Sequence, residues 1–524
     1  MSNNFAEIGR TIKTDSFIRR TLRFSFSTVI SRLLGLVREQ VFSHYFGAGA
    51  AVDSFNAAFR IPNLLRDFFA EGALSAAYVP VFSQKLKSEG LQKAFALTSS
   101  VFSLLLVLLG AISLIGMLLS PFLVRIIAPG FADTAGQAEL TAAMTRIMFP
   151  FLLFVALAAA AMGTLNCFGR FGIPALAPAG FNLASIAAGL FFREYFDPPI
   201  LVMAWGALIG GVLQLTMQMP QLFSLGFRFR FKIDLADPAV GSIVRLMGPA
   251  AIGVAAAQLN IVIGTMLASF LPEGSIAYMN YAFRLMHFPL GVFGVAVATV
   301  SLPKLSGDAA VGDRSELLKS YIRSCKIQSS MLLPSALFLI VAARPLCALI
   351  YQHGRFGWQD TVNAAAALQA YSFGLLFFGM VRLSAQVFYA FKDTATPVKV
   401  SALAVAVNVA ASLILMRPLG FVGLALAPAL AAQFNLGLLN FLIIRKIGRP
   451  DYPALTAHAA KCLAASLAGS AALYLILNEA GAYSGYKGIS AAMQSLAPAT
   501  AAFLLIYVGI GYLLKIFLRE TTVR

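Results

Sequence analysis

Residues 56–72 read NAAFRIPNLLRDFFAEG, a stretch that places four charged side chains in an otherwise apolar helical pattern. Its first five residues recur at 280–284 as NYAFR. Two further motif pairs are separated by nearly the same distance along the chain: VPVFS (79–83) with LPKLS (302–306), and FGRFGIP (168–174) with FKDTATP (391–397). The three offsets are 224, 223 and 223 positions, in the same order along the chain. A constant offset of this kind indicates an internal repeat.

The composition is that of a membrane protein. Of the 524 residues, 59% are hydrophobic and 12% are charged, whereas ordinary soluble domains are about 25% charged. Apolar runs long enough to cross a bilayer as helices recur along the whole chain. We therefore predict an all-α polytopic membrane protein with about fourteen transmembrane helices. They lie near 21–45, 54–84, 96–120, 141–168, 172–192, 200–226, 241–270, 275–303, 324–350, 363–390, 397–416, 420–444, 455–477 and 492–516.

The repeat offset aligns the second predicted span with the eighth and the fourth with the tenth. Each repeat then has six helices, an even number, so both copies insert in the same orientation around a central cavity. We expect two six-helix lobes related by a parallel repeat, plus two extra C-terminal helices. The expected organisation is a cytoplasmic segment at 1–20, an N-lobe at 21–228, a C-lobe at 240–446 and the extra pair at 453–518. GALIG at 206–210 predicts close helix packing.

The positive charge is unevenly distributed along the chain, which carries 40 Lys and Arg against 22 Asp and Glu. Most of these cations fall on alternate loops, which include RTIKTDSFIRRTLR, KLKSEGLQK, RFRFK and RKIGR. With both termini in the cytoplasm, this pattern follows the positive-inside rule, and it argues against nucleic acid as a partner. The polar, basic start of the chain does not resemble a cleaved signal peptide.

Several arginines fall inside predicted spans. An arginine at the bilayer centre costs about 2.5–3.5 kcal/mol, so such side chains usually face an aqueous cavity. Arg32 and Arg38 are six residues apart, about 9 Å along a helix and 120° around it, and so are Arg60 and Arg66. We hypothesise that these four arginines, with Arg284, converge on one cavity. Guanidinium groups there suit an anionic ligand, phosphate above all.

The competing interpretation is structural. Arginines near helix ends extend to the lipid head groups, and we favour this for Arg146 and Arg382. For Arg60 the two interpretations are evenly balanced. Neighbouring carboxylates at Glu39, Asp67 and Glu71 are also available to pair with arginines.

Enzyme signatures are missing from the sequence. We find no Gly-rich phosphate loop with its lysine and no nucleophile elbow. The histidines are isolated, and the four cysteines have no metal-ligand spacing. We expect a protein that is not an enzyme and that uses no cofactor or metal. Transport would then draw on an ion gradient or on the membrane potential.

Three long motifs carry a family resemblance. SRLLGLVREQVFSHYFGAGAAVDSFNAAFRIPNLLRDFFAEGALSAAYVPVF (31–82), YAFRLMHFPLGVFGVAVATVSLPKLS (281–306) and FYAFKDTATPVK (388–399) resemble the MurJ (MviN) family of lipid II flippases. The likeness runs from about residue 20 to 445. It implies the fold of the multidrug/oligosaccharidyl-lipid/polysaccharide exporter superfamily. It also implies alternating access that moves lipid II, the undecaprenyl-pyrophosphate-linked peptidoglycan precursor, from the cytoplasmic to the periplasmic leaflet of the bacterial inner membrane.

The resemblance also implies partners and site residues. The partners are lipid II, membrane lipids and the cell-wall synthesis machinery, and the extra helix pair lines a hydrophobic groove that suits the lipid tail. The implied site comprises cavity arginines at Arg32, Arg38, Arg66 and Arg284, a basic position at Arg60, Glu39 where the family commonly has Asp, and a functional Asp53 in the first outer loop. Residues 240–270 and 400–440 contain no Asp or Glu, which argues against a sodium site. Coupling to protons or to the membrane potential remains open.

Three other functions compete with this interpretation. A related exporter of another polysaccharide carrier lipid or of drugs has the same fold, although a drug exporter more often carries carboxylates than arginines in its cavity. A membrane glycosyltransferase acting on the same lipid needs catalytic carboxylates on an outer loop, and the predicted outer loops are short. A scaffold of the cell-wall machinery needs no arginine in a span, so it should tolerate Arg38→Ala.

Overall fold

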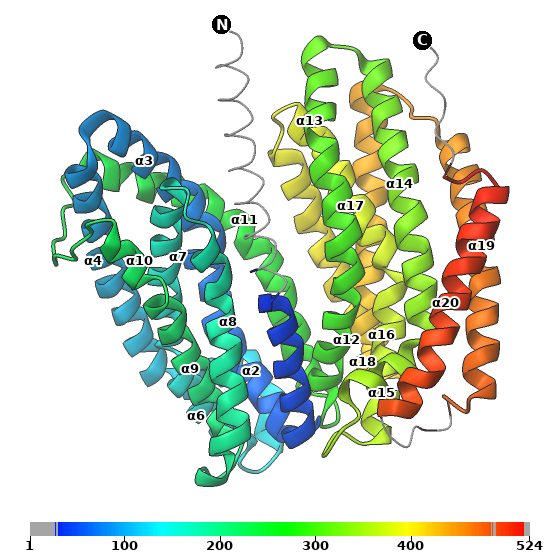
Figure 1. The fold of residues 1–524 in the computed structure, drawn as a ribbon, viewed down its shortest axis with the longest axis horizontal. Helices are drawn as coiled ribbons and strands as arrows, with labels where there is room; N and C mark the ends of the chain where they lie inside the picture. Colours follow the sequence, from blue (N-terminus) through cyan, green and yellow to red (C-terminus); the bar gives the residue numbers. More distant parts are fainter. Residues whose placement is uncertain (1–26, 28–29, 484, 486–488, 518–524) are drawn as a thin grey trace, which may run out of the picture. The chain divides into compact units, whose positions relative to one another are not determined.

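The computed structural model describes residues 27, 30–483, 485 and 489–517, and these residues form helices and turns without a strand (Figure 1). They divide into two compact units. Unit 1 lies within residues 1–46 and 50–262, and unit 2 lies within residues 47–49 and 263–524. The all-α prediction is confirmed. The predicted segment 1–20 lies outside the described residues, and the predicted lobe boundaries stay a prediction.

Unit 1 is built from consecutive helices, the first of which covers residues 30–46. The others are α2 (Ala50–Arg66), η1 (Asp67–Gly72), α3 (Ala73–Glu89), α4 (Leu91–Leu118), α5 (Ser120–Ile127), η2 (Pro129–Asp133), α6 (Gln137–Met148), α7 (Phe151–Cys167), α8 (Gly172–Ala187), η3 (Ala188–Phe192), η4 (Arg193–Tyr195), α9 (Leu201–Thr216), α10 (Met219–Ser224) and most of α11 (Pro238–Ala268).

Unit 2 contains the end of α11 and ten further elements. They are α12 (Ser275–Pro289), η5 (Leu290–Gly294), α13 (Val295–Val311), α14 (Arg314–Val341), α15 (Ala343–Tyr351), α16 (Trp358–Phe373), α17 (Leu375–Ala390), α18 (Ala395–Ile447), α19 (Tyr452–Glu479) and α20 (Ile489–Leu513).

The internal repeat is visible in the order of the helices. Helices α4 and α14 are each 28 residues long and begin 223 positions apart. The π-helical segments η1 and η5 also begin 223 positions apart, and each joins two α-helices, α2 to α3 and α12 to α13. The predicted parallel repeat is therefore confirmed at the level of element order, with α19 and α20 as the additional pair.

Ten helices of the described chain are long and apolar enough to cross a membrane. One of them, α18, is 53 residues long and contains a non-helical residue, Gly420, with φ of 56° and ψ of −135°. This left-handed backbone conformation suits glycine. The break at Gly420 divides α18 into two parts that match the predicted spans 397–416 and 420–444. The helix at 30–46, the continuous run from α2 to α3, and α11 match the remaining predictions, so a total of about fourteen is consistent with the fold.

One predicted span needs correction in detail. The predicted span 324–350 crosses a helix break, because α14 ends at Val341 and α15 begins at Ala343. Helix α14 begins earlier than predicted because the Asp313 side chain accepts a hydrogen bond from the Glu316 N–H at 3.0 Å, which caps the helix. Pro62 lies inside α2, and the change to π-helical geometry follows at Asp67.

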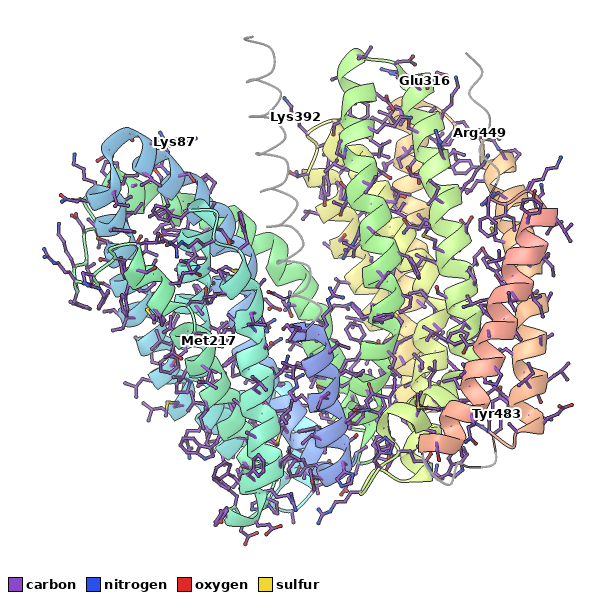
Figure 2. The ribbon with its side chains drawn as sticks, viewed as in Figure 1. Lys87, Met217, Glu316, Lys392, Arg449 and Tyr483 are labelled. Carbon is purple, nitrogen blue, oxygen red and sulfur yellow. The ribbon has the colours of Figure 1, made fainter. Side chains whose placement is uncertain are left out.

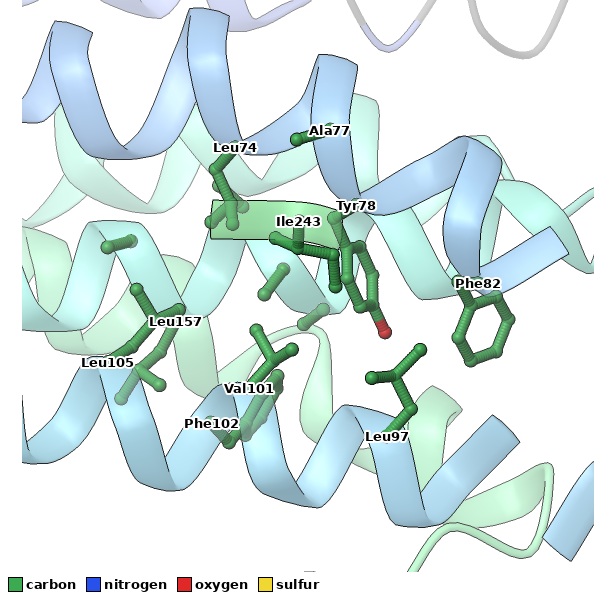
Figure 3. Packing of buried hydrophobic residues seen from close by; sticks show 14 of the residues in the cluster. Leu74, Ala77, Tyr78, Phe82, Leu97, Val101, Phe102, Leu105, Leu157 and Ile243 are labelled. Atoms are coloured by element: carbon green, nitrogen blue, oxygen red, sulfur yellow. The ribbon is translucent and has the colours of Figure 1, made fainter. Parts of the chain in front are cut away.

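The core of unit 1 lies where α3, α4, α7 and α11 meet (Figure 3). Tyr78 and Phe82 of α3 point toward Leu97 and Val101 of α4, and all four side chains are buried. The Tyr78 hydroxyl lies 2.8 Å from Thr98 Oγ1 and 2.7 Å from Thr164 Oγ1. Hydrogen bonds of this kind satisfy a buried hydroxyl inside an apolar bundle.

Unit 2 repeats the same device with different residues. The buried Tyr321 of α14 lies 2.8 Å from Ser384 Oγ, and its hydroxyl donates to Asn440 Oδ1 at 2.8 Å. Helices α19 and α20 pack against each other and against α14 and α15. Figure 2 shows Glu316, Lys392 and Arg449 at one end of this bundle and Tyr483 at the other, as expected of a bundle whose loops carry the charge.

The GALIG motif does provide close helix contact. A Cβ atom added at Gly210 on α9 would lie 2.7 Å from Phe181 Cδ2 and 2.9 Å from Phe181 Cα on α8. At Gly206 it would lie 2.9 Å from the Ala188 Cβ. The two helices approach too closely for a side chain at these positions, so the packing prediction is confirmed.

We predict that Gly210→Ala destabilises the protein by about 1–3 kcal/mol, because the added methyl group collides with the α8 backbone. The loss of stability is measured by heating the protein in detergent and quantifying by size exclusion the fraction that stays folded. The matched control is Gly110→Ala on α4, where an added Cβ meets nothing within 4 Å. Equal melting temperatures for the two variants would contradict the packing argument.

Candidate functional site

The helix over residues 30–46 carries three of the predicted site residues. Arg32 is exposed, Arg38 is half-buried and Glu39 is buried. The helix is held against α8, since Asn182 Nδ2 donates to the Ser31 carbonyl at 3.0 Å. Gly35 lies beside the same Asn182 amide, where a Cβ would make only ordinary van der Waals contact at 3.5 Å.

Arg38 and Glu39 form an ion pair. Arg38 Nη2 lies 2.6 Å from Glu39 Oε1, and Arg38 Nε donates to the same oxygen at 3.2 Å. The two side chains are 17% and 10% exposed. The guanidinium also lies over the Phe181 ring, 5.1 Å from its centroid, a cation–π contact that suits a partly desolvated cation.

Arg66 and Asp67 repeat this arrangement in the continuous helical run from α2 to α3. Arg66 Nη2 and Nε lie 2.8 and 3.1 Å from Asp67 Oδ1. The second oxygen, Asp67 Oδ2, accepts a hydrogen bond from Gln258 Nε2 of α11. Arg66 is the last residue of α2 and Asp67 the first of η1, so the pair sits at the change from α-helical to π-helical geometry, a feature that is frequent at functional sites.

The remaining unit 1 residues lie on α2. Asp53 is in the first turn of this helix and is 3% exposed, so the structure places it inside the helix and not in the loop before it. A carboxylate in the first turn is favoured by the positive end of the helix dipole. Arg60 lies two turns further along the same helix and is half-buried.

Unit 2 contributes Arg284, which is exposed on α12. Its helix is fixed by two hydroxyl groups: Tyr278 donates to Asp360 Oδ1 at 2.8 Å, and Tyr281 donates to the Gly47 carbonyl at 3.0 Å. His287, one turn after Arg284, contacts Phe283 with the two rings tilted by 40° and their centroids 3.9 Å apart.

The structure brings the predicted residues together in pairs. It joins Arg38 to Glu39 and Arg66 to Asp67, whereas Arg284 belongs to the other unit. Sequence reasoning missed Phe181 and Gln258. Gln258 had a detectable signal, because it is a polar residue in an apolar helix, but the contact of Phe181 with Arg38 depends on helix packing and has no signature in the sequence.

Potential metal ligands are dispersed over the described part of the chain. No group of three or more His, Cys, Asp and Glu residues within it is placed to hold a metal ion. Asn408 and Ser412, one turn apart on α18, are both buried, but an amide and a hydroxyl bring no negative charge to a cation.

The arginines of each unit carry chemical groups of a kind that binds anions. Arginine presents planar donors that match carboxylate and phosphate oxygens. The neighbouring carboxylates hold Arg38 and Arg66 in fixed orientations and reduce the cost of placing a cation in an apolar helix. The apolar side chains of the same helices suit the hydrocarbon part of an amphipathic ligand.

Comparisons with known proteins agree with this chemistry. The family model described as "Lipid II flippase MurJ" matches residues 42–489. A protein of Haemophilus influenzae named "Probable lipid II flippase MurJ" is 35% identical over 469 residues, which cover 86% of this chain and 91% of the relative. The "Lipid II flippase MurJ" of Burkholderia cenocepacia is 35% identical over 437 residues, or 83% of this chain and 84% of that protein.

Solved structures show the same fold. A structure titled "Lipid II flippase MurJ, inward closed conformation" matches with a TM-score of 0.78 and 25% identity, covering 94% of this chain and 99% of that one. An inward-facing multidrug resistance MATE transporter of the MOP superfamily matches with a TM-score of 0.65 and 15% identity, covering 81% of this chain and 98% of that one, a likeness of fold alone. With the family model matching most of the chain, the protein belongs to the MurJ family of lipid II flippases.

Proposed function

We propose that this chain translocates lipid II from the cytoplasmic to the periplasmic leaflet of the bacterial inner membrane by alternating access. The observation that carries the proposal is Arg66, a half-buried guanidinium within the continuous helical run from Ala50 to Glu89. A cation in that position is energetically costly, so arginines placed there usually have a function. In a member of this family, the fitting function is binding the pyrophosphate of the lipid.

The substrate consists of a polyprenyl tail, a pyrophosphate and a sugar part. The chain offers a partner for the first two. The pyrophosphate is matched by Arg32, Arg38, Arg60, Arg66 and Arg284, with Glu39 orienting Arg38. The polyprenyl tail is matched by the apolar surfaces of α19 and α20, which expose Leu467, Leu475 and Leu505. Asp53, buried in the first turn of α2, completes the proposed set of functional residues.

The mechanism is transport without covalent chemistry. The two units exchange between states that open the cationic cavity to one leaflet and then to the other. Both termini lie in the cytoplasm, and the energy comes from a proton gradient or from the membrane potential, about 2.3 kcal/mol per charge at 100 mV. Contacts with the cell-wall synthesis machinery supply the substrate and remove the product.

The alternative within the same fold is an exporter of another polysaccharide carrier lipid. The same arginines would bind any polyprenyl pyrophosphate, so the distinction depends on the sugar part and must be made by experiment. A drug exporter is less consistent with a site whose charged groups are mainly arginines.

The direct test measures lipid II at the outer leaflet of cells whose own flippase has been depleted. Expression of this protein at a matched membrane level should restore exposure of lipid II. If a folded, membrane-inserted protein leaves lipid II inaccessible, the substrate assignment fails and another carrier lipid takes its place.

Substitution of Arg284 by Ala should reduce the same lipid II signal at least tenfold, because one charge-assisted contact to phosphate contributes about 1.5–3 kcal/mol. The matched control is Arg146→Ala. Arg146 is also an exposed intramembrane arginine, but its Nε donates to the Met117 carbonyl at 3.2 Å near a helix end. An equal loss in both variants would show that the effect is not specific to the cavity.

Arg38 and Glu39 allow a sharper test, because a single substitution leaves its partner charge buried. Arg38→Gln alone should lower both stability and transport, since the buried Glu39 carboxylate loses its ion pair with Arg38, a loss of about 1–3 kcal/mol. The double variant Arg38→Gln/Glu39→Gln removes both charges and should recover most of the melting temperature.

Transport by this double variant distinguishes the two roles of Arg38. If Arg38 binds the anionic substrate, lipid II exposure stays low although the protein is stable. Recovery of transport along with stability would mean that Arg38 serves only to neutralise Glu39.

A further inference from the structure

We propose that the segment connecting α10 to α11, residues 226–237, is a membrane-surface anchor that binds the head groups of anionic phospholipids. The proposal concerns unit 1 alone and does not depend on which lipid the protein transports. It rests on three observations: how the segment is fixed, where along α4 it lies, and which side chains it exposes.

The segment is fixed to unit 1 along its whole length. At its start, Phe227 is buried against Phe95 and Phe102 of α4, with ring centroids 5.6 and 5.7 Å apart. In its middle, the Lys232 N–H donates to Ser103 Oγ at 3.0 Å. At its end, Lys85 Nζ lies 2.7 Å from Asp237 Oδ2.

The Lys85–Asp237 contact is a strong one. Burial alone would raise the pKa of Asp237, but hydrogen bonds from Lys85 and from the Ala239 N–H lower it below its ordinary value. The carboxylate is therefore charged at neutral pH, and the Lys85 side chain is largely buried against it. A connection anchored at both ends and in the middle holds its side chains in fixed positions.

The hydrogen bond to Ser103 places the segment at the edge of the apolar part of α4. Ten residues before Ser103, about 15 Å along the helix, α4 exposes the cation Lys93. Three residues after it begin the exposed apolar side chains Leu106, Val107 and Leu108. This change from exposed charge to exposed hydrocarbon marks the level of the membrane interface on the surface of unit 1.

The exposed side chains of the segment have the chemistry expected at the membrane interface. Arg228, Arg230 and Lys232 alternate with aromatic residues, and all three cations are exposed. Phe229, Phe231, Ile233 and Leu235 expose large apolar side chains, with Phe231 at 61% and Leu235 at 69%. Lys232 pairs with Asp234 at 2.8 Å, but exposed pairs of this kind contribute little.

Aromatic and aliphatic side chains beside arginines are the composition of an interfacial anchor, in which apolar groups enter the acyl boundary and cations meet lipid phosphates. A nucleic acid or an acidic protein could bind the cations. Neither ligand would cover the apolar residues beside the hydrocarbon surface of α4. We therefore assign the segment to anionic phospholipid.

The experiment introduces a fluorescent reporter by Phe231→Trp in the full chain, reconstituted in nanodiscs. One set of nanodiscs contains phosphatidylglycerol brominated on its acyl chains, and the other contains brominated phosphatidylcholine. The mole fraction of brominated lipid is the same in both sets. We expect the added indole to be quenched in both, and quenched about threefold more efficiently by phosphatidylglycerol, because cations near the surface attract anionic lipid. The two native tryptophans are accounted for by the unsubstituted protein.

Charge variants in the same background test the cause. Arg228→Gln/Arg230→Gln should abolish the preference for phosphatidylglycerol while leaving quenching by phosphatidylcholine intact. The control Lys87→Gln/Lys93→Gln, which removes two other exposed cations of unit 1, should keep the preference. Quenching no greater than in the unsubstituted protein, or equal quenching by the two lipids, would overturn the proposal, as would an equal loss in the control.

Discussion

The hydrogen bonds that join two intramembrane arginines, Arg38 and Arg66, to the carboxylates that follow them are the interactions on which the functional part of unit 1 depends. Arg38 with Glu39, and Arg66 with Asp67, place opposite charges on adjacent residues. An isolated guanidinium in a bilayer is expensive, whereas an ion pair with further hydrogen bonds is tolerated. The pairing therefore allows helices of this apolarity to hold cations away from water and still insert into the membrane.

The same pairing sets the orientation of the arginines. Phe181 supports the Arg38 guanidinium from α8, and Gln258 holds Asp67 from α11. Each cation is thus supported by a helix other than its own, and the position of Phe181 depends in turn on the absence of a side chain at Gly210. A rigid cation loses less entropy when it binds phosphate than a flexible one does. Close helix packing and the orientation of the Arg38 guanidinium are therefore linked through a few residues.

The two halves share an architecture but differ in charge. The order of α-helix, π-helical segment and α-helix occurs in both at an offset of 223 positions. The charged stretch 31–40 in the first half, however, corresponds at this offset to an uncharged stretch, VAAAQLNIVI, at 254–263. The first half supplies most of the candidate arginines and the second half supplies Arg284. A duplicated fold that has diverged in this way fits an asymmetric substrate with one charged and one apolar end.

The sequence was sufficient to predict the fold class, the repeat and most of the helices, because apolar run length and motif spacing are properties of the chain itself. It also identified the arginines, because charges in apolar runs are conspicuous. It could not place Asp53 in the first turn of α2 or locate the π-helical segment at Asp67, since one residue decides each of these boundaries. The contacts of Phe181 and Gln258 could not be predicted from the sequence, because they depend on which helices pack together.

The central claim is that the arginines bind the pyrophosphate of the lipid and not merely stabilise the helices. The most direct measurement is competition for binding of labelled lipid II to the purified protein, with undecaprenyl pyrophosphate and undecaprenol as competitors. These competitors share the hydrocarbon tail and differ only in the pyrophosphate. The account predicts that undecaprenyl pyrophosphate displaces lipid II and that undecaprenol does not at the same concentration. Equal displacement by both would show that the tail alone determines binding, and would contradict the account.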